Sequence, residues 1–569
     1  MNSVKGNLSG VHLALAVLFL LLASLSVFPQ SLIRTTNHES SQLVRTYQLT
    51  HEDEQFLEDL ERRSFQYFWD QGDPQTGLVA DRARADGSRL DDDHLNVGSI
   101  AATGFGLTAL CIAADRRWID RTQARERTTN TLRFFANRAF EKHGWFYHWL
   151  DTKTGERRWK SEVSSIDTAL LLAGVLTARQ YFRDDREVVT LATKIYERID
   201  FPWMLNNNPT LLSMGWHPES GFIKSRWDTY SEDAILYLPA IGSPTHPISG
   251  RSWYAFWRDR YRYEGYAYFT TIGVPLFMHQ YAHAWIDFRK RRETSGDHID
   301  YFENSVNATL AHRAFCINLS HEFPGYGPNV WGITASDSAK GYLAWGGPPR
   351  DPAIDGTVVP SAPGGSLMFT PELALASLRT MREKFGDRVY GRYGFVDAFN
   401  PNTGWLDSDV IGINVGIILL SAENMRTGNV WRWFMRNAEM PRAMEKVGLR
   451  TYKARKNPTR GKGDAETRGR AGGGYPSPSG NRTRYAKHPR VAASPLPRVR
   501  FQLVQLPFKD SITPRIKRDG WKPDCSLGLR TLALESRIIG RLGRTNIRSD
   551  IRKLAATSDL DRSGKGTIR

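Results

Sequence analysis

Cysteine is scarce in this chain, which has three cysteines among 569 residues, at positions 111, 316 and 525. Their spacing matches no metal-binding or redox motif, so the sequence predicts neither a disulfide framework nor a thiolate-bound metal. His246 likewise has no second and third ligand at a diagnostic spacing. We therefore expect no metal and no cofactor.

The first 449 residues lack an excess of charge of either sign. They carry 48 Lys+Arg and 51 Asp+Glu, a net charge of −3, whereas residues 450–569 carry 29 and 9, a net charge of +20. The positive net charge of the chain, +17, therefore comes from the C-terminal segment alone. Sixteen of the 17 tryptophans precede residue 450, which suits core packing and stacking on sugar rings equally.

Residues 450–569 lack the apolar content of a folded domain. They are rich in Arg, Gly, Ser and Pro, so we predict a basic, mostly disordered tail in which 501–508 and 527–542 are the candidates for short elements. A basic tail can bind anionic lipid, acidic polysaccharide or nucleic acid. An uninformative extension, including one from an altered reading frame, is an equal alternative. No nucleic-acid recognition motif is present, so we expect no specific nucleic-acid partner and assign the tail no function.

The N-terminus carries an apolar run, 11–28, without Asp, Glu, Lys or Arg. It follows Lys5 and ends among small residues, so residues 1–30 are predicted to be a signal peptide or a membrane anchor, followed by a linker at 31–50. Either alternative places the body outside the cytoplasm. We expect a periplasmic or secreted protein, or one anchored to the inner membrane.

Residues 51–449 show helical periodicity and little period-two alternation, which is confined to 146–149 and 221–223. We predict an all-α body. The predicted helical segments are 53–70, 97–114, 122–140, 164–182, 186–199, 231–238, 265–288, 297–322, 371–385, 410–424 and 430–440. Long Gly-, Pro- and Trp-rich loops at 203–225, 242–253 and 326–367 separate them, and such loops commonly line a functional site.

One stretch, 225–254, combines aromatic residues and prolines with Asp228, Glu232 and Asp233. An ordinary core or surface rarely needs this mixture. We interpret it as the wall and floor of a carbohydrate-binding cleft.

Six motifs occur in order: IDTALLLAG (166–174), YSE (230–232), GSPTHP (242–247), WGITASD (331–337), GTVVP (356–360) and ENMRTG (423–428). Together they resemble the glycoamylase-like family of bacterial glycoside hydrolases, which is related to the endo-β-1,2-glucanases. The resemblance covers roughly 54–440. The resemblance implies an (α/α)6 barrel with long cleft-forming loops. It also implies inverting hydrolysis of a β-glucan, and the favoured substrate is β-1,2-glucan or a related oligosaccharide.

Glu232 occupies the motif position of the family's general acid. An acid of this kind needs a partly desolvated site to keep its proton, and Trp227 and Tyr230 precede it closely. Two alternatives stay open: sugar binding, and a capping box with Thr229 as N-cap.

Asp167 precedes an apolar run and also fits a capping pattern with Ser164. By resemblance it is a catalytic-cleft residue that holds substrate hydroxyls or water, assisted by Glu162. The cleft role and the cap are equal alternatives.

The general base departs from the family pattern. Where the relatives carry an acid, this chain has Asn414, which cannot accept a proton. Asp407 or Asp409 supplies the base, or the reaction differs, or the enzyme is impaired. The segment 405–409 also resembles an ordinary helix start.

The remaining substrate-binding candidates are cleft residues suggested by their aromatic, basic or motif character. Trp253 and Trp345 stack on sugars or pack in the core, His246 binds sugar hydroxyls or is structural, and Asp337 follows from a family motif. The full set is Glu162, Arg226, Trp227, Tyr230, His246, Trp253, Asp337, Tyr342, Trp345 and Asn414.

Two functions of different classes follow. The first is a β-glucan hydrolase with Glu232 as acid, and the second is a non-catalytic glucan-binding or scaffold protein of the cell envelope, suggested by Asn414. Reducing-end release from β-1,2-glucan that disappears in Glu232→Gln separates them.

Overall fold

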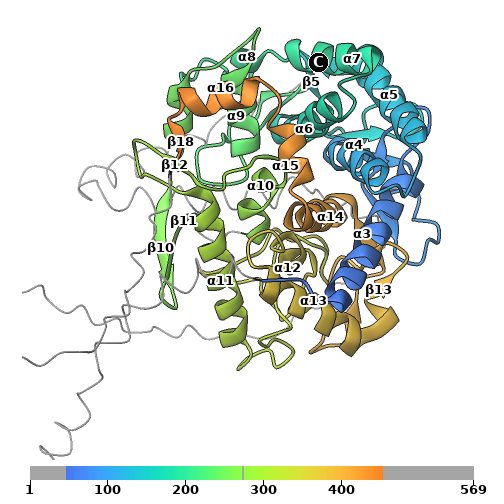
Figure 1. Cartoon of the computed structure of the whole chain (residues 1–569), viewed down its shortest axis with the longest axis vertical. Coiled ribbons are helices and arrows are strands. Elements are labelled where there is room, and N and C mark those ends of the chain that lie inside the picture. Colours follow the sequence, from blue (N-terminus) through green and yellow to red (C-terminus); the bar gives the residue numbers. More distant parts are fainter. Residues whose placement is uncertain (1–46, 272–274, 453–569) are drawn as a thin grey trace, which may run out of the picture. The chain divides into compact units, whose positions relative to one another are not determined.

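The computed structural model describes residues 47–271 and 275–452 of the chain. This part is mainly helical (Figure 1). The α-helices are α3 (His51–Gln71), α4 (Ile100–Asp115), α5 (Arg121–Asn137), α6 (Ser165–Tyr181), α7 (Arg186–Glu197), α8 (Phe201–Leu205), α9 (Ala234–Gly242), α10 (Tyr281–Trp285), α11 (Tyr301–Leu319), α12 (Ser361–Gly365), α13 (Pro371–Phe385), α14 (Gly412–Arg426), α15 (Asn429–Phe434) and α16 (Glu439–Lys446).

Helices α4, α6 and α14 are buried on nearly every face, because small and apolar residues surround their axes. Glycines bring α4 and α6 into backbone contact. A Cβ on Gly104 would lie 2.1 Å from the carbonyl oxygen of Leu170, and one on Gly174 would lie 2.1 Å from that of Gly104. Any side chain at either glycine would separate the two helices. These helices are the centre of the core.

Helices α3, α5 and α7 lie outside them, along the edge of the view in Figure 1. Each is amphipathic. In α7 the buried positions are Val188, Ala192, Ile195 and Tyr196, the spacing of one helix face. Helix α3 begins with a capping box between Thr50 and Asp53. Periodicity predicted these outer helices well because one face of each meets water.

The ENMRTG motif builds a buried ion-pair network at the C-terminal ends of α4 and α14. Arg426 pairs with Glu54 at 2.9 Å, with Glu58 at 3.2 Å and with the fully buried Glu61. Arg116, at the end of α4, pairs with Glu423 at 2.8 Å. This motif therefore stabilises the fold, at the helix ends opposite the strands described next.

Short antiparallel strands precede the inner helices. They are β1 (Val79–Ala80), β2 (Arg82–Arg84), β3 (Val97–Ser99), β4 (Glu141–Lys142), β5 (Trp145–Phe146), β6 (Trp149–Asp151), β7 (Val163–Ser164), β8 (Gly215–His217), β9 (Gly221–Phe222), β10 (Asp259–Tyr263), β11 (Tyr266–Thr270), β12 (Arg291–Glu293), β13 (Tyr390–Gly391), β14 (Gly394–Phe395), β15 (Phe399–Asn400), β16 (Trp405–Leu406), β17 (Asp409–Ile411) and β18 (Leu449–Thr451). The short 3-10 helices are η2 (Gly250–Tyr254), η3 (Leu276–His279) and η4 (Gly386–Arg388).

The strand pairs bring the N-terminal ends of three inner helices together. Strand β3 leads into α4 and pairs with β1 and β6, β7 leads into α6, and β17 leads into α14. Strand β17 pairs with β2, so that Asp409 lies opposite Arg84. Tyr147, beside β6, bridges to Val163 of β7. The long loops and the carboxylates that follow them therefore meet at one end of the fold.

Three predicted helical segments need correction. The segment 265–288 begins with strand β11, which pairs with β10 just before it through a two-residue turn, Glu264 and Gly265, whose φ angles are both positive. The alternating tyrosines of these strands were the missed signal. Residues 405–409 belong to strands β16 and β17 rather than to a helix start, and 430–440 divides into α15 and the start of α16.

No helix in the described ranges is long and apolar enough to cross a membrane. The predicted signal or anchor at 1–30, most of the linker, and nearly all of the predicted basic tail lie outside the residues that the structure describes.

Candidate active site

Glu232 lies in the turn before α9, and the structure excludes its predicted role as a cap. Helix α9 begins at Ala234, its N-cap is Asp233, and neither Thr229 nor Glu232 caps it. The Glu232 side chain is buried, and within the described residues its Oε2 atom has no hydrogen-bond partner. Burial raises the pKa of Glu232 to about 7, and the charge of Asp167 adds to this. Glu232 is therefore a carboxyl group that holds a proton near neutrality with one oxygen free.

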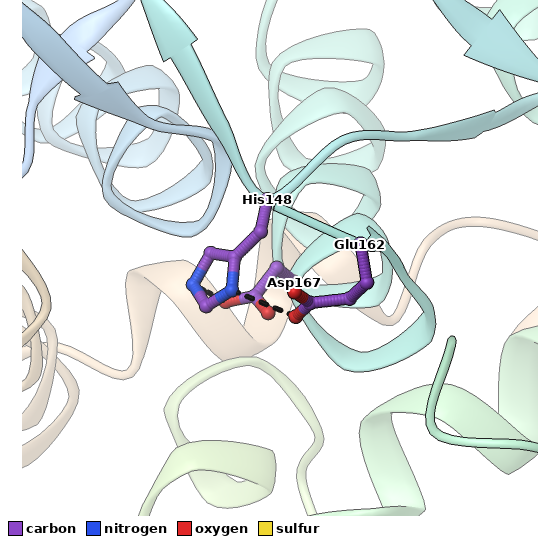
Figure 2. A group of neighbouring side chains, drawn as sticks. All are labelled: His148, Glu162 and Asp167. Carbon is purple, nitrogen blue, oxygen red and sulfur yellow. Dashed lines mark hydrogen bonds and ion pairs between the residues drawn. The ribbon is translucent and has the colours of Figure 1, made fainter. Parts of the chain in front are cut away.

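A histidine bridges the carboxylates at the start of α6 (Figure 2). Nδ1 of His148 lies 3.0 Å from Oε1 of Glu162, and Nε2 lies 3.4 Å from Oδ1 of Asp167. Burial opposes the charge on His148, but the two carboxylates outweigh it and raise its pKa to about 9. Burial also disfavours the charged form of Glu162 and so raises its pKa. His148 outweighs this effect and lowers the pKa of that carboxyl group to about 2. The group is an imidazolium held between two carboxylates.

Asp167 makes the predicted capping contact, and its role in the cleft stays a prediction. Ser164 is the N-cap of α6, accepts a hydrogen bond from the Asp167 amide, and donates from its hydroxyl to Asp167 Oδ2 at 2.5 Å. The opposite oxygen faces His148. Burial raises the pKa of Asp167 although His148 lowers it. Asp167 is thus held in place at the helix start and shares its surroundings with Glu232.

Three further carboxyl groups lie close together at the start of α14. Oxygens of Asp337, Asp397 and Asp407 lie within 4.8 Å of one another, and all three residues are buried. Burial, followed by the charge of the neighbouring carboxylates, raises the pKa of Asp397 to about 7 and that of Asp407 to about 8. Arg82 pairs with Asp337 at 2.7 Å.

Asp397, like His148, is a site residue that the sequence did not reveal. Asn414 donates to its Oδ1 at 2.7 Å, and the Asp337 amide donates to its Oδ2 at 2.8 Å. It stands in the short apolar run 395–399, which belongs to none of the six motifs. A single carboxylate inside such a run was the available signal, because burying one without partners is costly.

The two sequence candidates for the base differ in their surroundings. Both oxygens of Asp409 are taken by arginines, Arg84 at 2.5 Å and Arg82 at 3.5 Å. Asp407 has a buried Oδ2 atom without a partner in the described part of the chain, and its raised pKa keeps it protonated near neutrality.

Tyr281 and Tyr342 connect the two groups of carboxylates. Burial raises the pKa of the Tyr281 phenol, and so do the charges of Glu232, Asp397 and Asp167. Its hydroxyl lies 3.3 Å from Asn414 Oδ1. Tyr342 is 40% exposed, and the charges of Asp397 and Asp337 act on its phenol. The charges of Glu232, Asp167 and Asp397 thus all act on the phenol of Tyr281, which indicates that the three carboxyl groups lie near this residue.

The structure places two predicted sugar-stacking tryptophans in the core. Trp253 is fully buried and donates from Nε1 to Glu293 at 2.7 Å. Trp345 is 1% exposed and donates to Ser336 at 3.2 Å. The stacking prediction is wrong for both, and the packing alternative holds.

Three other candidates position the backbone near the site. Arg226 donates to the carbonyl oxygens of Leu205 and Leu211, at 2.8 and 2.6 Å, and so fastens a loop. Trp227 is buried and donates to Ser165 Oγ at 2.8 Å, two residues from Asp167. Tyr230 is buried and accepts from Asn304 at 3.0 Å. These contacts give the three residues supporting roles, and their direct contacts with sugar stay a prediction.

The structure does not bring His246 to the carboxylates. It follows the C-terminal end of α9, a helix of nine residues, so the length of that helix, about 13 Å, separates it from the helix start beside Glu232. Its ring contacts the Glu197 carbonyl oxygen at 3.3 Å. His246 belongs to a loop contact, which corrects its predicted role in binding.

The protein is mainly α-helical, and its buried carboxyl groups lie near the N-terminal ends of the inner helices. A family model described as "Putative glucoamylase" matches residues 224–438. The chain is similar to glycoamylase-like proteins and to the endo-β-1,2-glucanases, a likeness that its motifs predicted.

The similar proteins include two solved structures and one characterised relative. An endo-β-1,2-glucanase from Chitinophaga pinensis is 29% identical, with a TM-score of 0.66 over 71% of this chain and 99% of its own. A putative glucoamylase from Bacteroides caccae is 29% identical, with a TM-score of 0.64 over 70% of this chain and 100% of its own. An exo-β-1,2-glucooligosaccharide sophorohydrolase (non-reducing end) from Parabacteroides distasonis is 26% identical over 452 residues, which are 73% of this chain and 60% of that relative. The chain thus spans less than two thirds of this last protein.

Proposed function

We propose that the protein is a glycoside hydrolase that cleaves β-1,2-glucan or a related gluco-oligosaccharide by an inverting mechanism. The observation that carries the proposal is Glu232, a buried carboxyl group with a pKa near 7 and an oxygen without a hydrogen-bond partner among the described residues, close enough to Asp167 for that charge to raise its pKa. Glycoside hydrolysis requires such a protonated group beside an ionised one. The relatives that act on β-1,2-linked glucans support the substrate class.

Glu232 is the general acid in this proposal, and it protonates the glycosidic oxygen of the departing sugar. Asp397 is the general base that activates water on the other face. Its two oxygens are oriented by Asn414 and by the Asp337 amide. Asp409 is less suited because arginines occupy both of its oxygens, and Asp407 because it stays protonated.

Asp167 and Glu162 hold the substrate in this scheme. His148 keeps both carboxylates in place through its two ring nitrogens. Ionised carboxylates accept hydrogen bonds from sugar hydroxyls, and Asp167 is near enough to Glu232 to influence its pKa. Asp337, held by Arg82, and the exposed Tyr342 border the same region on the opposite side.

The fold in this proposal is an (α/α)6 barrel formed by residues 51–449. Contacts between successive helices support an inner ring of α4, α6, α9, α10, α12 and α14. Helices α3, α5, α7, α11, α13 and α16 pack outside them. We further propose a periplasmic or secreted location, with residues 1–30 as signal peptide or inner-membrane anchor, because the apolar run at 11–28 has the composition of such a segment.

A non-catalytic glucan-binding or scaffold protein is the second candidate, and Asn414 favours it, because it stands where an acid is expected. Incubation of the purified protein with β-1,2-glucan separates the two. Release of reducing ends that Glu232→Gln abolishes supports the hydrolase. Binding without release, unchanged by the substitution, supports the scaffold and contradicts the hydrolase.

A further inference from the structure

An exposed tryptophan, which also contacts His94, lies near the outer end of a row of aromatic rings that leads to the carboxylates. The ring of Trp149 is stacked on His148, with centroids 3.5 Å apart and 12° between the planes. Trp159 meets Trp149 edge to face at 5.3 Å, and His94 meets Trp159 in the same way at 5.5 Å. The row therefore runs from His148, between Glu162 and Asp167, to Trp159.

The loop that carries Trp159 is firmly held in an uncommon conformation. Trp159 and Lys160 have φ angles of 51° and 49°, in the left-handed region that bulky residues rarely adopt. Arg157 donates to the carbonyl oxygens of Ser161 and Lys160, at 2.6 and 2.5 Å. Arg158 pairs with Asp151 at 3.1 Å. A bulky residue stays in this conformation only where its surroundings hold it there. Here the contacts of Arg157 and Arg158 hold the loop so that Trp159 is exposed.

The Trp159 ring is partly exposed, and Trp149 and His94 pack against it edge to face. Its side chain is 37% exposed, and in the described part of the chain no aromatic ring lies parallel to it. Its Nε1 atom donates to Asp93 at 3.3 Å, which orients the ring. Asp93 and Lys160 are exposed beside it and offer polar groups for hydroxyls. An apolar face with a polar border suits a pyranose ring, which has apolar C–H faces and hydroxyl edges.

We propose that Trp159 is the platform of an outer sugar-binding subsite, which takes a glucosyl unit of a longer chain some way from the bond that is cleaved. The inference rests on the proposed function and extends it to the length of the substrate. Stacking at Trp159 adds binding for long chains and none for short ones, because a short ligand at Glu232 does not reach the end of the row.

The test is steady-state kinetics on β-1,2-gluco-oligosaccharides of increasing length, with wild type, Trp159→Ala and Trp159→Phe. Phe140→Ala is the matched control, because Phe140 is also exposed, at 59%, and takes part in no ring contact among the described residues. We expect Trp159→Ala to raise KM for long substrates by roughly 3- to 10-fold with little change in kcat, the equivalent of one aromatic contact. Short substrates should be unaffected, and Trp159→Phe should restore part of the affinity.

The outcomes separate this inference from the proposed function. If wild type cleaves the glucan and Trp159→Ala matches it at every length, or differs no more than Phe140→Ala, the subsite is refuted and the hydrolase stands. An equal loss at all lengths together with a lowered Tm shows a structural role and also refutes the subsite. If wild type neither cleaves nor binds the glucan, the proposed function fails and the subsite with it.

Discussion

Asn414 donates a hydrogen bond of 2.7 Å to Oδ1 of Asp397. The residue that looked like a missing base is therefore the partner of a carboxylate. The side-chain amide also donates to the Ala335 carbonyl oxygen at 3.1 Å, so its orientation is defined. Asn414 positions Asp397, and the absence of an acid at position 414 does not leave this end of the site without one.

We expect Glu232→Gln to lower kcat on β-1,2-glucan by about 10²- to 10⁴-fold, the usual contribution of a general acid. Glutamine cannot deliver a proton but has the same shape, so Tm should not fall. Reducing-end release and thermal unfolding measure the two effects. Glu126→Gln, at an exposed position of α5, is the control. Unchanged release by Glu232→Gln contradicts the assignment.

Asp397→Asn should reduce kcat to a similar extent, because an amide cannot accept the proton of the attacking water. Asp409→Asn is the comparison, and it should act mainly on stability, because it removes the ion pairs of Asp409 with Arg84 and Arg82 while Arg82 keeps Asp337. If Asp409→Asn abolishes turnover and Asp397→Asn does not, the base is Asp409.

Asn414→Ala should move the acidic limb of the pH profile to higher pH. The hydrogen bond from Asn414 favours the ionised form of Asp397 and lowers its pKa, so removing it raises the pKa of the base. The limb is measured as kcat/KM against pH. An unchanged limb with reduced kcat shows that Asn414 acts on something other than the ionisation of Asp397.

A plot of kcat/KM against pH should be a narrow bell-shaped curve centred near pH 7. The pKa of Glu232 is about 7, and the acid must be protonated, so activity falls as the pH rises above that value. The pKa of Asp397 is also about 7, and the base must be ionised, so activity falls as the pH drops below it. A plateau that extends several units to either side contradicts this pair of assignments.

His148 should stabilise the fold most at and below neutral pH. Its pKa is raised from 6.5 to about 9, so its contribution is complete below pH 6.5 and is lost as the pH rises through 9. The difference in Tm between wild type and His148→Gln should therefore be larger at pH 6 than at pH 9.5. A difference that is the same at both pH values shows that the imidazolium charge does not contribute.

Arg426→Ala should cost about 3–5 kcal/mol in the free energy of unfolding, because it leaves the buried Glu61 without its main partner. Arg62→Ala removes an exposed pair with Glu58 and should cost about 0–1 kcal/mol. Urea unfolding of both variants measures the contrast. Equal costs show that the network at the ends of α4 and α14 is not strongly coupled.

The sequence by itself determined the helical class and most helix positions, and it pointed to Glu232 as the candidate acid. Helical periodicity is local, and so are the capping pattern of Ser164 and the motif around Glu232. Helix α9 shows the limit of local signals, since the capping box at Thr229 to Glu232 is present in the sequence and absent from the fold.

Only the tertiary structure decided which side chains meet. Asp397 and Asn414 lie 17 residues apart, and His148 meets two carboxylates because the neighbouring Tyr147 bridges to Val163 of β7. Trp253 and Trp159 look alike in a sequence, yet one is fully buried and the other is held outward by a left-handed loop. Burial and the pairing of charges depend on segments distant in the chain, and local patterns carry no record of them.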